Sequence, residues 1–465
     1  MENSEFLGKE PVGKLLFKLA LPAITAQLIN MLYNIVDRIY IGHIADIGSL
    51  ALTGVGVCMP IIMLISAFAA LVSMGGAPRA SIFMGRHDHK TAQKIMSNCF
   101  TMLIIIAVII TGTLFFFQED LLLMFGASSN TIQYAMEYMS IYTLGTIFVQ
   151  IALGMNAFIT AQGFAKTSML TVLIGAITNI ILDPILIFGF NMGVEGAALA
   201  TIISQAISAL WVVWFLMGKK TILKINIKDM KLQPSLVLPC IALGMSPFIM
   251  QSTESIIAVC FNSSLLTYGG DIAVGAMTIL TSVMQFSMLP LQGISQGAQP
   301  ITSYNYGAKN KQRVKEVFKK LLFASFIYSA ILWVAIMVAP QLFAGMFTPD
   351  QQLIDFTKTA MRIYMAVSVI FSVQISCQMT LIAIGNVKAS VFIAILRKIL
   401  LLIPLIYILP NIFLQNQTMA VYFAEPVADI IAVTCTIIIF VTQFKKALRE
   451  LGEEEEVLPE LEKSF

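Results

Sequence analysis

Long apolar stretches alternate with short polar segments along the whole chain, and this pattern predicts the fold. A helix needs about 20 apolar residues to cross a hydrocarbon core of about 30 Å. Twelve stretches meet that requirement, with approximate boundaries at 15–38, 50–74, 95–117, 133–158, 167–189, 194–217, 236–261, 272–294, 316–343, 358–382, 389–412 and 418–444. We therefore expect an all-α integral membrane protein with twelve transmembrane helices.

The chain also repeats itself at a shift of 222 positions. Identical residues recur at this shift over a long span: Pro78 and Pro300, Gly85 and Gly307, Tyr142 and Tyr364, Gly163 and Gly385, Lys166 and Lys388, and Ser168 and Ser390. A constant shift indicates two copies of one unit, an arrangement that places a binding site at their interface. We predict an N-terminal six-helix bundle at 1–217, a connector at 218–235, a C-terminal six-helix bundle at 236–444 and a charged tail at 445–465.

Composition agrees with this class. Hydrophobic residues make up 58% of the chain and charged residues 12%, about half the charged share of a soluble domain. The formal net charge of +3 gives no reason to expect a nucleic-acid partner. The expected partners are the lipid bilayer and small molecules, and the protein is expected to function as a monomer, because two halves in one chain already form the interface.

The loops predict the orientation. Lys and Arg cluster around the start of the first span and after the second, sixth, eighth and twelfth spans, whereas the intervening loops carry mainly Asp and Glu. The positive-inside rule then places both termini, and the connector, in the cytoplasm. We expect a multi-pass protein of the bacterial cytoplasmic membrane. No cleavable signal peptide is expected, because Lys18 and other charges precede a stretch of full spanning length.

Polar residues within the spans are the functional candidates, because a carboxylate at membrane depth is costly unless it is protonated, paired or hydrated. In the first span, Asn30, Tyr33, Asn34 and Asp37 recur at three- and four-residue spacing and therefore share one helical face. The alternative for Asp37 is a surface ion pair near the end of its helix, beside Arg38.

The fifth span contains Asn179 and Asp183, four residues apart on one face, followed by Pro184. Proline removes a backbone N–H and frees a carbonyl one turn earlier, a local irregularity suited to a cation or proton site. Asn156 in the fourth span and Thr201 in the sixth can complete a small polar pocket. The alternative for Asp183 is that it only stabilises the kink.

The second copy does not repeat this pocket, since Asp37 matches Val259 and Asp183 matches Leu405 at the same shift. This asymmetry suggests that ion coupling is confined to the first half. The second half has its own buried charges, and we expect Arg397 or Lys398 to pair with Glu425 or Asp429 as a structural group. Glu254 lacks an evident partner and stays a candidate for substrate or proton contact.

Several of these segments together resemble the MATE family of multidrug and toxic compound extrusion transporters, and most of all its bacterial MepA/DinF-like branch. The resemblance covers nearly the whole chain. It rests on the two six-helix halves and on four segments: Tyr33 to Gly42 with its acid Asp37, Gly76 to Arg79, Asn179 to Pro184, and Gly196 to Thr201.

The resemblance implies a V-shaped pair of bundles that exports organic, mostly cationic compounds by alternating access, in exchange for protons or sodium. It assigns ion coupling to Asp37, Asn179, Asp183 and Thr201, which would also hold a sodium ion. It places Asn30, Asn34 and Asn156 along the first-half cavity. The chain departs from the NorM-type pattern in the tenth span, where Gln374 and Gln378 occur and no acid does.

We therefore expect a secondary active transporter with no cofactor, a coupling ion that is a proton or sodium, ion-coupling residues Asp37, Asn179, Asp183 and Thr201, and substrate contacts at Asn30, Tyr33, Asn34, Asn156 and Glu254. The alternative is a flippase for a lipid-linked oligosaccharide or cell-wall precursor. A flippase needs buried Arg and Lys for a pyrophosphate group. An enzyme is disfavoured because no His-rich or Ser/Lys constellation lies at depth.

Overall fold

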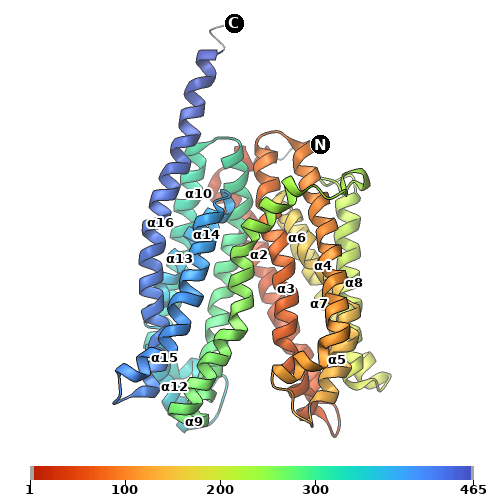
Figure 1. The fold of residues 1–465 in the computed structure, drawn as a ribbon, viewed down its shortest axis with the longest axis vertical. Helices are drawn as coiled ribbons and strands as arrows, with labels where there is room; N and C mark the ends of the chain where they lie inside the picture. Colours follow the sequence, from red (N-terminus) through yellow and green to blue (C-terminus); the bar gives the residue numbers. More distant parts are fainter. Residues whose placement is uncertain (1–4, 462–465) are drawn as a thin grey trace.

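The chain forms two groups of long helices. The computed structural model describes residues 5–461, with side chains described as far as Leu451, and every regular element in that range is helical. Figure 1 shows that the two groups lie together at the end where α1 begins and α16 ends, and diverge toward the opposite end. This V-shaped arrangement confirms the predicted fold class.

The predicted first half contains the helices up to residue 217. They are α1 (Phe6–Lys9), α2 (Val12–Gly42), α3 (Gly48–Gly85), α4 (His89–Met124), α5 (Ile132–Leu144), α6 (Thr146–Ala161), α7 (Ala165–Pro184), the π-helix η1 (Ile185–Gly189) and α8 (Gly193–Met217). The π-helix follows Pro184 directly, at the irregularity that the proline predicted.

The remaining helices belong to the connector and the predicted second half. They are the 3-10 helix η2 (Ile227–Asp229), α9 (Pro234–Gly307), α10 (Lys311–Val338), α11 (Pro340–Gly345), α12 (Gln351–Tyr364), the 3-10 helix η3 (Ser368–Ile370), α13 (Phe371–Ala383), α14 (Val387–Ile395), the π-helix η4 (Leu396–Leu402), α15 (Ile403–Ile412) and α16 (Gln417–Leu461). The first part of the predicted charged tail continues α16, and residues 462–465 lie outside the described range.

The twelve predicted spans are present once the long helix α9 is divided. Within the described residues, nine helices are long and apolar enough to cross a membrane, or eleven when each of two bent pairs is one span. The 74 residues of α9 comprise two helices joined at Gly270, whose φ of +64° and ψ of −162° are not helical. Glycine adopts this conformation without the penalty that a side chain would bring.

The bends repeat with the sequence. Helices α5 and α6 meet at 59° across Gly145, and α12 meets the segment that ends with α13 at 48°. The helices before these bends end at Leu144 and Tyr364, close to the pair Tyr142 and Tyr364 that the shift of 222 relates. The two copies therefore share irregular features as well as apolar stretches.

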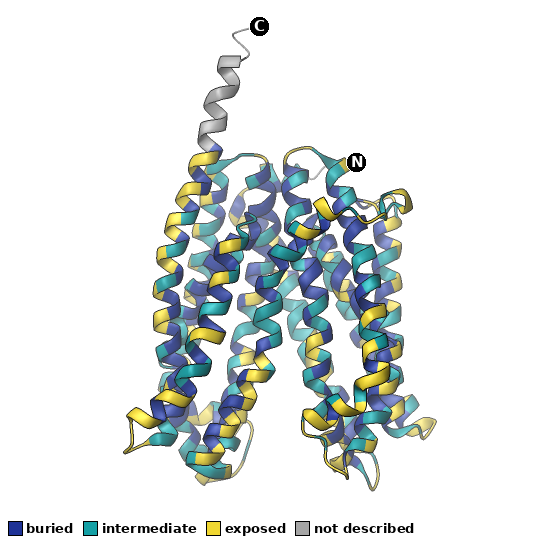
Figure 2. Cartoon of the chain, in the orientation of Figure 1, coloured by how far each residue is buried: buried dark blue, intermediate teal, exposed yellow. Residues whose placement is uncertain are grey.

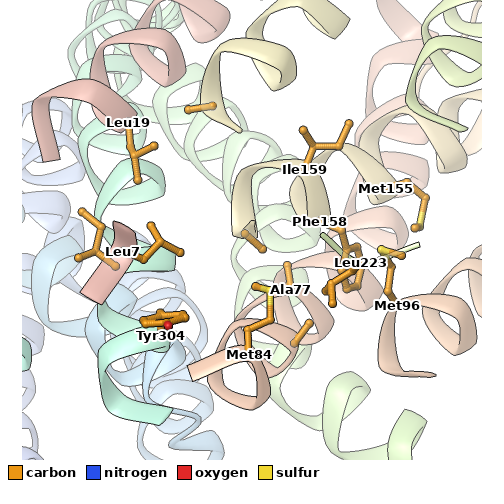
Figure 3. Packing of buried hydrophobic residues seen from close by; sticks show 14 of the residues in the cluster. Leu7, Leu19, Ala77, Met84, Met96, Met155, Phe158, Ile159, Leu223 and Tyr304 are labelled. Carbon is orange, nitrogen blue, oxygen red and sulfur yellow. The ribbon is translucent and has the colours of Figure 1, made fainter. Parts of the chain in front are cut away.

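Three large hydrophobic clusters supply most of the packing among the described residues, and two smaller ones lie in the second half. One contains only first-half residues, such as Ile41 and Val149, and another contains only second-half residues, such as Phe261 and Tyr422. The largest cluster contains residues of both halves, and Figure 3 shows part of it, including Leu7, Met84, Phe158 and Tyr304. In Figure 2, buried residues predominate where the two groups meet.

Glycines allow the helix backbones to touch where the halves meet. A methyl group at Gly75 of α3 would collide with the backbone of Cys240 and Gly244 in α9, and one at Gly244 would collide with the backbone of Leu71. The pair Gly85 and Gly307, related by the shift of 222, makes similar backbone contacts at the residues where α3 and α9 end. Small residues are the usual means of close helix contact in membranes.

The segment before α2 crosses between the halves. Leu7 is fully buried, and its carbonyl oxygen accepts hydrogen bonds from Asn305 Nδ2 at 2.9 Å and Arg313 Nη2 at 3.1 Å. Arg313 Nη2 also donates to the Glu10 carbonyl at 2.8 Å. The Phe6 ring covers Gly163, which belongs to the first half and leaves no room for a side chain. This segment therefore links both halves at the closed end.

Replacing Arg313 with methionine is expected to loosen this segment. The change removes two charge-assisted hydrogen bonds to backbone carbonyls, and each such bond contributes about 2 kcal/mol. Hydrogen–deuterium exchange of the amides in residues 6–15 should become faster, whereas Lys315→Met, at an exposed position of the same helix, should leave it unchanged. Equal exchange in Arg313→Met and the unaltered protein would show that Arg313 does not hold this segment in place.

The connector is held by side chains of the first half. Gln162 Oε1 accepts hydrogen bonds from the backbone N–H groups of Ile222 and Leu223, at 2.8 and 2.7 Å. Asn98 donates to the Asp229 carbonyl at 2.9 Å and accepts from the Gln233 N–H at 2.7 Å. Buried backbone groups need such partners, so the connector follows a defined path across the closed end.

Candidate functional site

Asp37 and Asp183 come together from different helices. Asp37 lies near the end of α2 and Asp183 near the end of α7, and their carboxyl groups are in hydrogen-bonding contact. Asp37 is 6% exposed and Asp183 is fully buried. The alternative of a surface ion pair for Asp37 is therefore wrong. Two carboxylates in contact cannot both be ionised without a large electrostatic cost.

Asn179 and Thr201 lie beside the acid pair. Asn179 Nδ2 donates to Asp183 Oδ1 at 3.1 Å, one turn along α7, and is 3.5 Å from Thr201 Oγ1 in α8. The Tyr138 hydroxyl of α5 is in hydrogen-bonding contact with Thr201. Sequence reasoning missed Tyr138, because α5 shows no polar periodicity that would direct this residue inward.

Three oxygens of this cluster have no hydrogen-bond partner within the described residues: Asp37 Oδ1, Asp183 Oδ2 and Asn179 Oδ1. A buried oxygen without a partner is unfavourable. A proton shared between the two carboxyl groups satisfies one acceptor directly. A sodium ion would instead take oxygens from Asp37, Asp183, Asn179 and Thr201, a donor set of the oxygen type that hard cations prefer.

A small cavity of about 50 Å³ adjoins the cluster. Its walls include Asn30, Tyr33, Asn156, Asn179 and Thr201, from α2, α6, α7 and α8. A drug-sized ligand needs about 300 Å³ or more, whereas this space holds only water or an ion. The cavity in this conformation is therefore large enough for water or a small ion and too small for a drug-sized molecule.

The other predicted contact residues of the first half divide into two groups. Asn156 donates to the Ser168 carbonyl at 3.2 Å, and its Oδ1 atom is buried without a partner beside the cavity. Asn34 is exposed and donates to the Asn30 carbonyl of its own helix at 2.7 Å. The structure thus brings Asn30, Tyr33 and Asn156 to one cavity and leaves Asn34 outside its walls.

Glu254 is not alone, which corrects the expectation from the sequence. Lys398 Nζ lies 2.7 Å from Glu254 Oε1 and forms an ion pair between η4 and α9. The sequence left open whether Arg397 or Lys398 pairs with Glu425 or Asp429, and only Arg397 does so. Consecutive helical residues point in directions about 100° apart, so Lys398 and Arg397 reach different neighbours.

Arg397 alone pairs with both acids of α16. Its Nη2 lies 2.7 Å from Glu425 Oε1 and its Nε lies 2.8 Å from Asp429 Oδ1, with all three side chains at most 6% exposed. The guanidinium also stacks 4.3 Å from the centre of the Phe371 ring. A guanidinium offers several donors in a fixed fork, which suits two acceptors one helical turn apart.

Replacing Arg397 with methionine is expected to destabilise the second half by about 3 to 5 kcal/mol, because it leaves two buried carboxylates without a cation. Thermal unfolding of the purified protein should report this loss. The triple change Arg397→Met, Glu425→Gln and Asp429→Asn should recover most of it. Unfolding of the single variant at the temperature of the unaltered protein would contradict the structural role.

Comparison with known proteins adds a family relationship. The family model MatE matches residues 22–185 and 247–408, which is most of the chain and one segment in each predicted half. The chain is 26% identical over 412 residues to "Multidrug export protein MepA" of Staphylococcus aureus (strain N315), covering 89% of this chain and 90% of that protein. It is also 26% identical to the protein of the same name from Staphylococcus haemolyticus (strain JCSC1435), over 93% of this chain and 94% of that one.

Solved structures share the fold. One is described as the "Outward-facing conformation of a multidrug resistance MATE family transporter of the MOP superfamily"; it matches with a TM-score of 0.88 and 22% identity, over 97% of this chain and 99% of that one. At this identity the match supports the fold alone. The V shape and the order of the helices are therefore those of known transporters.

Proposed function

Because the chain belongs to the MATE family of membrane transporters, we propose that it exports organic, mostly cationic compounds in exchange for a proton or a sodium ion. The observation that carries this proposal is the buried contact between Asp37 and Asp183. Neither carboxyl group forms an ion pair within the described residues, so the pair can gain and lose a cation, and this is the property that ion-coupled transport requires. The family assignment makes the chain a transporter and not an enzyme.

The coupling ion acts through the first half in this proposal. With a proton or sodium ion bound, the pair Asp37 and Asp183 carries one negative charge fewer and α2 and α7 stay packed together. Loss of that ion leaves negative charge in a buried site and favours a different packing. A ligand shifts the equilibrium only by its different affinity for the two states. Ion and substrate therefore need opposite preferences: the state that binds the ion more tightly must bind the substrate less tightly.

Substrate is proposed to bind where the halves 1–217 and 236–444 face each other, or in a first-half cavity that enlarges during the cycle. The present cavity of about 50 Å³ excludes a drug-sized molecule. Asn30, Tyr33 and Asn156 line that cavity and are proposed to contact substrate when it opens, and Asn34 is proposed to do so from the adjoining exposed face. If both termini are cytoplasmic, as the loop charges predict, the V opens to the outside.

The flippase alternative has little support from the buried charges. Within the described residues, Arg397 and Lys398 are the buried basic side chains, and each is already paired with acids of the second half. A pyrophosphate group needs cations that are free to bind it. Because Arg397 and Lys398 are already paired with acids, neither is free to bind an anionic group. This favours cationic over anionic substrates.

Ethidium efflux tests the proposed function. Drug-sensitive bacteria that express the protein are loaded with ethidium, and efflux is followed while the proton gradient or the sodium gradient is collapsed. Export that stops when one of these gradients is removed supports the antiporter and identifies its ion. If neither ethidium nor other cationic dyes are exported, the function is wrong, and transport of a labelled lipid-linked precursor becomes the next test.

A further inference from the structure

Long side chains of the second half occupy the place that corresponds, by the repeat, to the cavity of the first half. Gly175 and Ala176 line the first-half cavity, and the shift of 222 matches them with Arg397 and Lys398. The repeat thus places two long cations where the first half has the smallest side chains. The same fold position therefore holds an open polar space in one copy and a set of ion pairs in the other.

The ion pairs of the second half differ in their access to solvent. Arg397, Glu425 and Asp429 are each at most 6% exposed and form one closed group. In the pair of Lys398 and Glu254, the lysine side chain is 8% exposed whereas the glutamate side chain is 54% exposed. Glu254 is thus the member of this network that a molecule outside the helix bundle can reach.

The charges of the network do not balance. Glu254, Glu425 and Asp429 supply three negative charges, whereas Arg397 and Lys398 supply two positive charges. The Lys398 ammonium group lies 2.7 Å from the one accessible carboxylate. Without the Lys398 ammonium group, the Glu254 carboxylate would be accessible and unpaired, and the group of Arg397, Glu425 and Asp429 would add a further net negative charge. Such an arrangement attracts cations.

We propose that Lys398 determines substrate specificity by acting as a tethered cation that occupies Glu254 and keeps organic cations from binding to the second half. This inference rests on the proposed function, because it concerns cationic substrates. A lysine ammonium is a compact charge on a flexible stem and can fill a site that an ion would otherwise occupy. Cation binding is thereby confined to the part of the transporter that contains Asp37 and Asp183.

Binding of tetraphenylphosphonium to the purified protein in lipid nanodiscs tests this role by titration calorimetry. Lys398→Met should bind an additional equivalent of the cation, or bind it at least about tenfold more tightly. Lys398→Arg keeps the charge and should behave as the unaltered protein does. Glu254→Gln combined with Lys398→Met removes both charges and should abolish the gain.

The outcomes separate this inference from the proposed function. If the unaltered protein binds the cation and folded Lys398→Met binds it with the same stoichiometry and affinity, the inference is wrong and the proposed function stands. If the unaltered protein binds none and Lys398→Met does, the inference holds and the substrate class is wrong. A gain that persists in the double variant also overturns the role of Glu254. Should Lys398→Met not fold, Lys398→Gln is measured in its place.

Discussion

Replacing Asp183 or Asp37 with asparagine is expected to reduce ion-coupled export to the level of cells that lack the protein. Asparagine keeps the size of the side chain and removes its ability to bind and release a proton. The two carboxyl groups are in contact and buried, so neither can replace the other as the site of exchange. Ethidium efflux, measured together with the amount of protein in the membrane, checks this expectation.

Stability should not fall in these variants. An amide at position 183 can still accept the hydrogen bond from Asn179, and it lacks the cost of burying a charge. Asp120→Asn, the same change at an exposed position in α4, serves as the matched control and should export dye normally. Normal export by Asp37→Asn or Asp183→Asn would remove the acid pair from the mechanism.

Replacing Gly75 with alanine is expected to have the second large effect, on the assembly of the closed end. The added methyl group would collide with the backbone of Cys240 and Gly244, and a backbone cannot yield without a shift of the whole helix. Overpacking that forces the backbone to shift costs about 1 to 3 kcal/mol, and occasionally more. Thermal unfolding of the purified variant should show the loss, and ethidium efflux should fall with it.

A glycine on the same helix provides the control. A methyl group at Gly56 of α3 would meet nothing within 4 Å, and alanine favours a helix over glycine by about 1 kcal/mol. Gly56→Ala should therefore keep or raise the unfolding temperature. Gly244→Ala should behave like Gly75→Ala, because its methyl group would collide with the backbone of Leu71. Equal stability of Gly75→Ala and Gly56→Ala would contradict the direct backbone contact.

The helices could be predicted from the sequence because the requirement to cross an apolar layer is local. Each span needs its own run of apolar residues, and the repeat at 222 positions related the two sets. The contact of Asn179 with Asp183 was predictable for the same reason, because residues four apart meet on one helix. The break at Gly270 lies between two predicted spans, although the flanking helices extend closer to it than the apolar runs indicate.

Contacts between distant segments could not be derived from periodicity. The approach of Asp37 to Asp183 depends on how α2 and α7 cross, and only the family resemblance indicated it. The sequence left open which of Arg397 and Lys398 faces Glu425 and Asp429, and it showed no partner for Glu254, because it does not specify which neighbour each of two adjacent cations faces. Tyr138 was missed because its inward direction follows from the packing of α5 against α8 and not from a pattern within α5.

The most direct test of the central claim is the release of the coupling ion when substrate binds. Purified protein in weakly buffered solution is mixed with tetraphenylphosphonium, while a pH indicator follows protons and a selective electrode follows sodium. The unaltered protein should release one of these ions on binding, and Asp37→Asn and Asp183→Asn should release neither. Binding without release of either ion, or equal release by the variants, would contradict exchange at the pair Asp37 and Asp183.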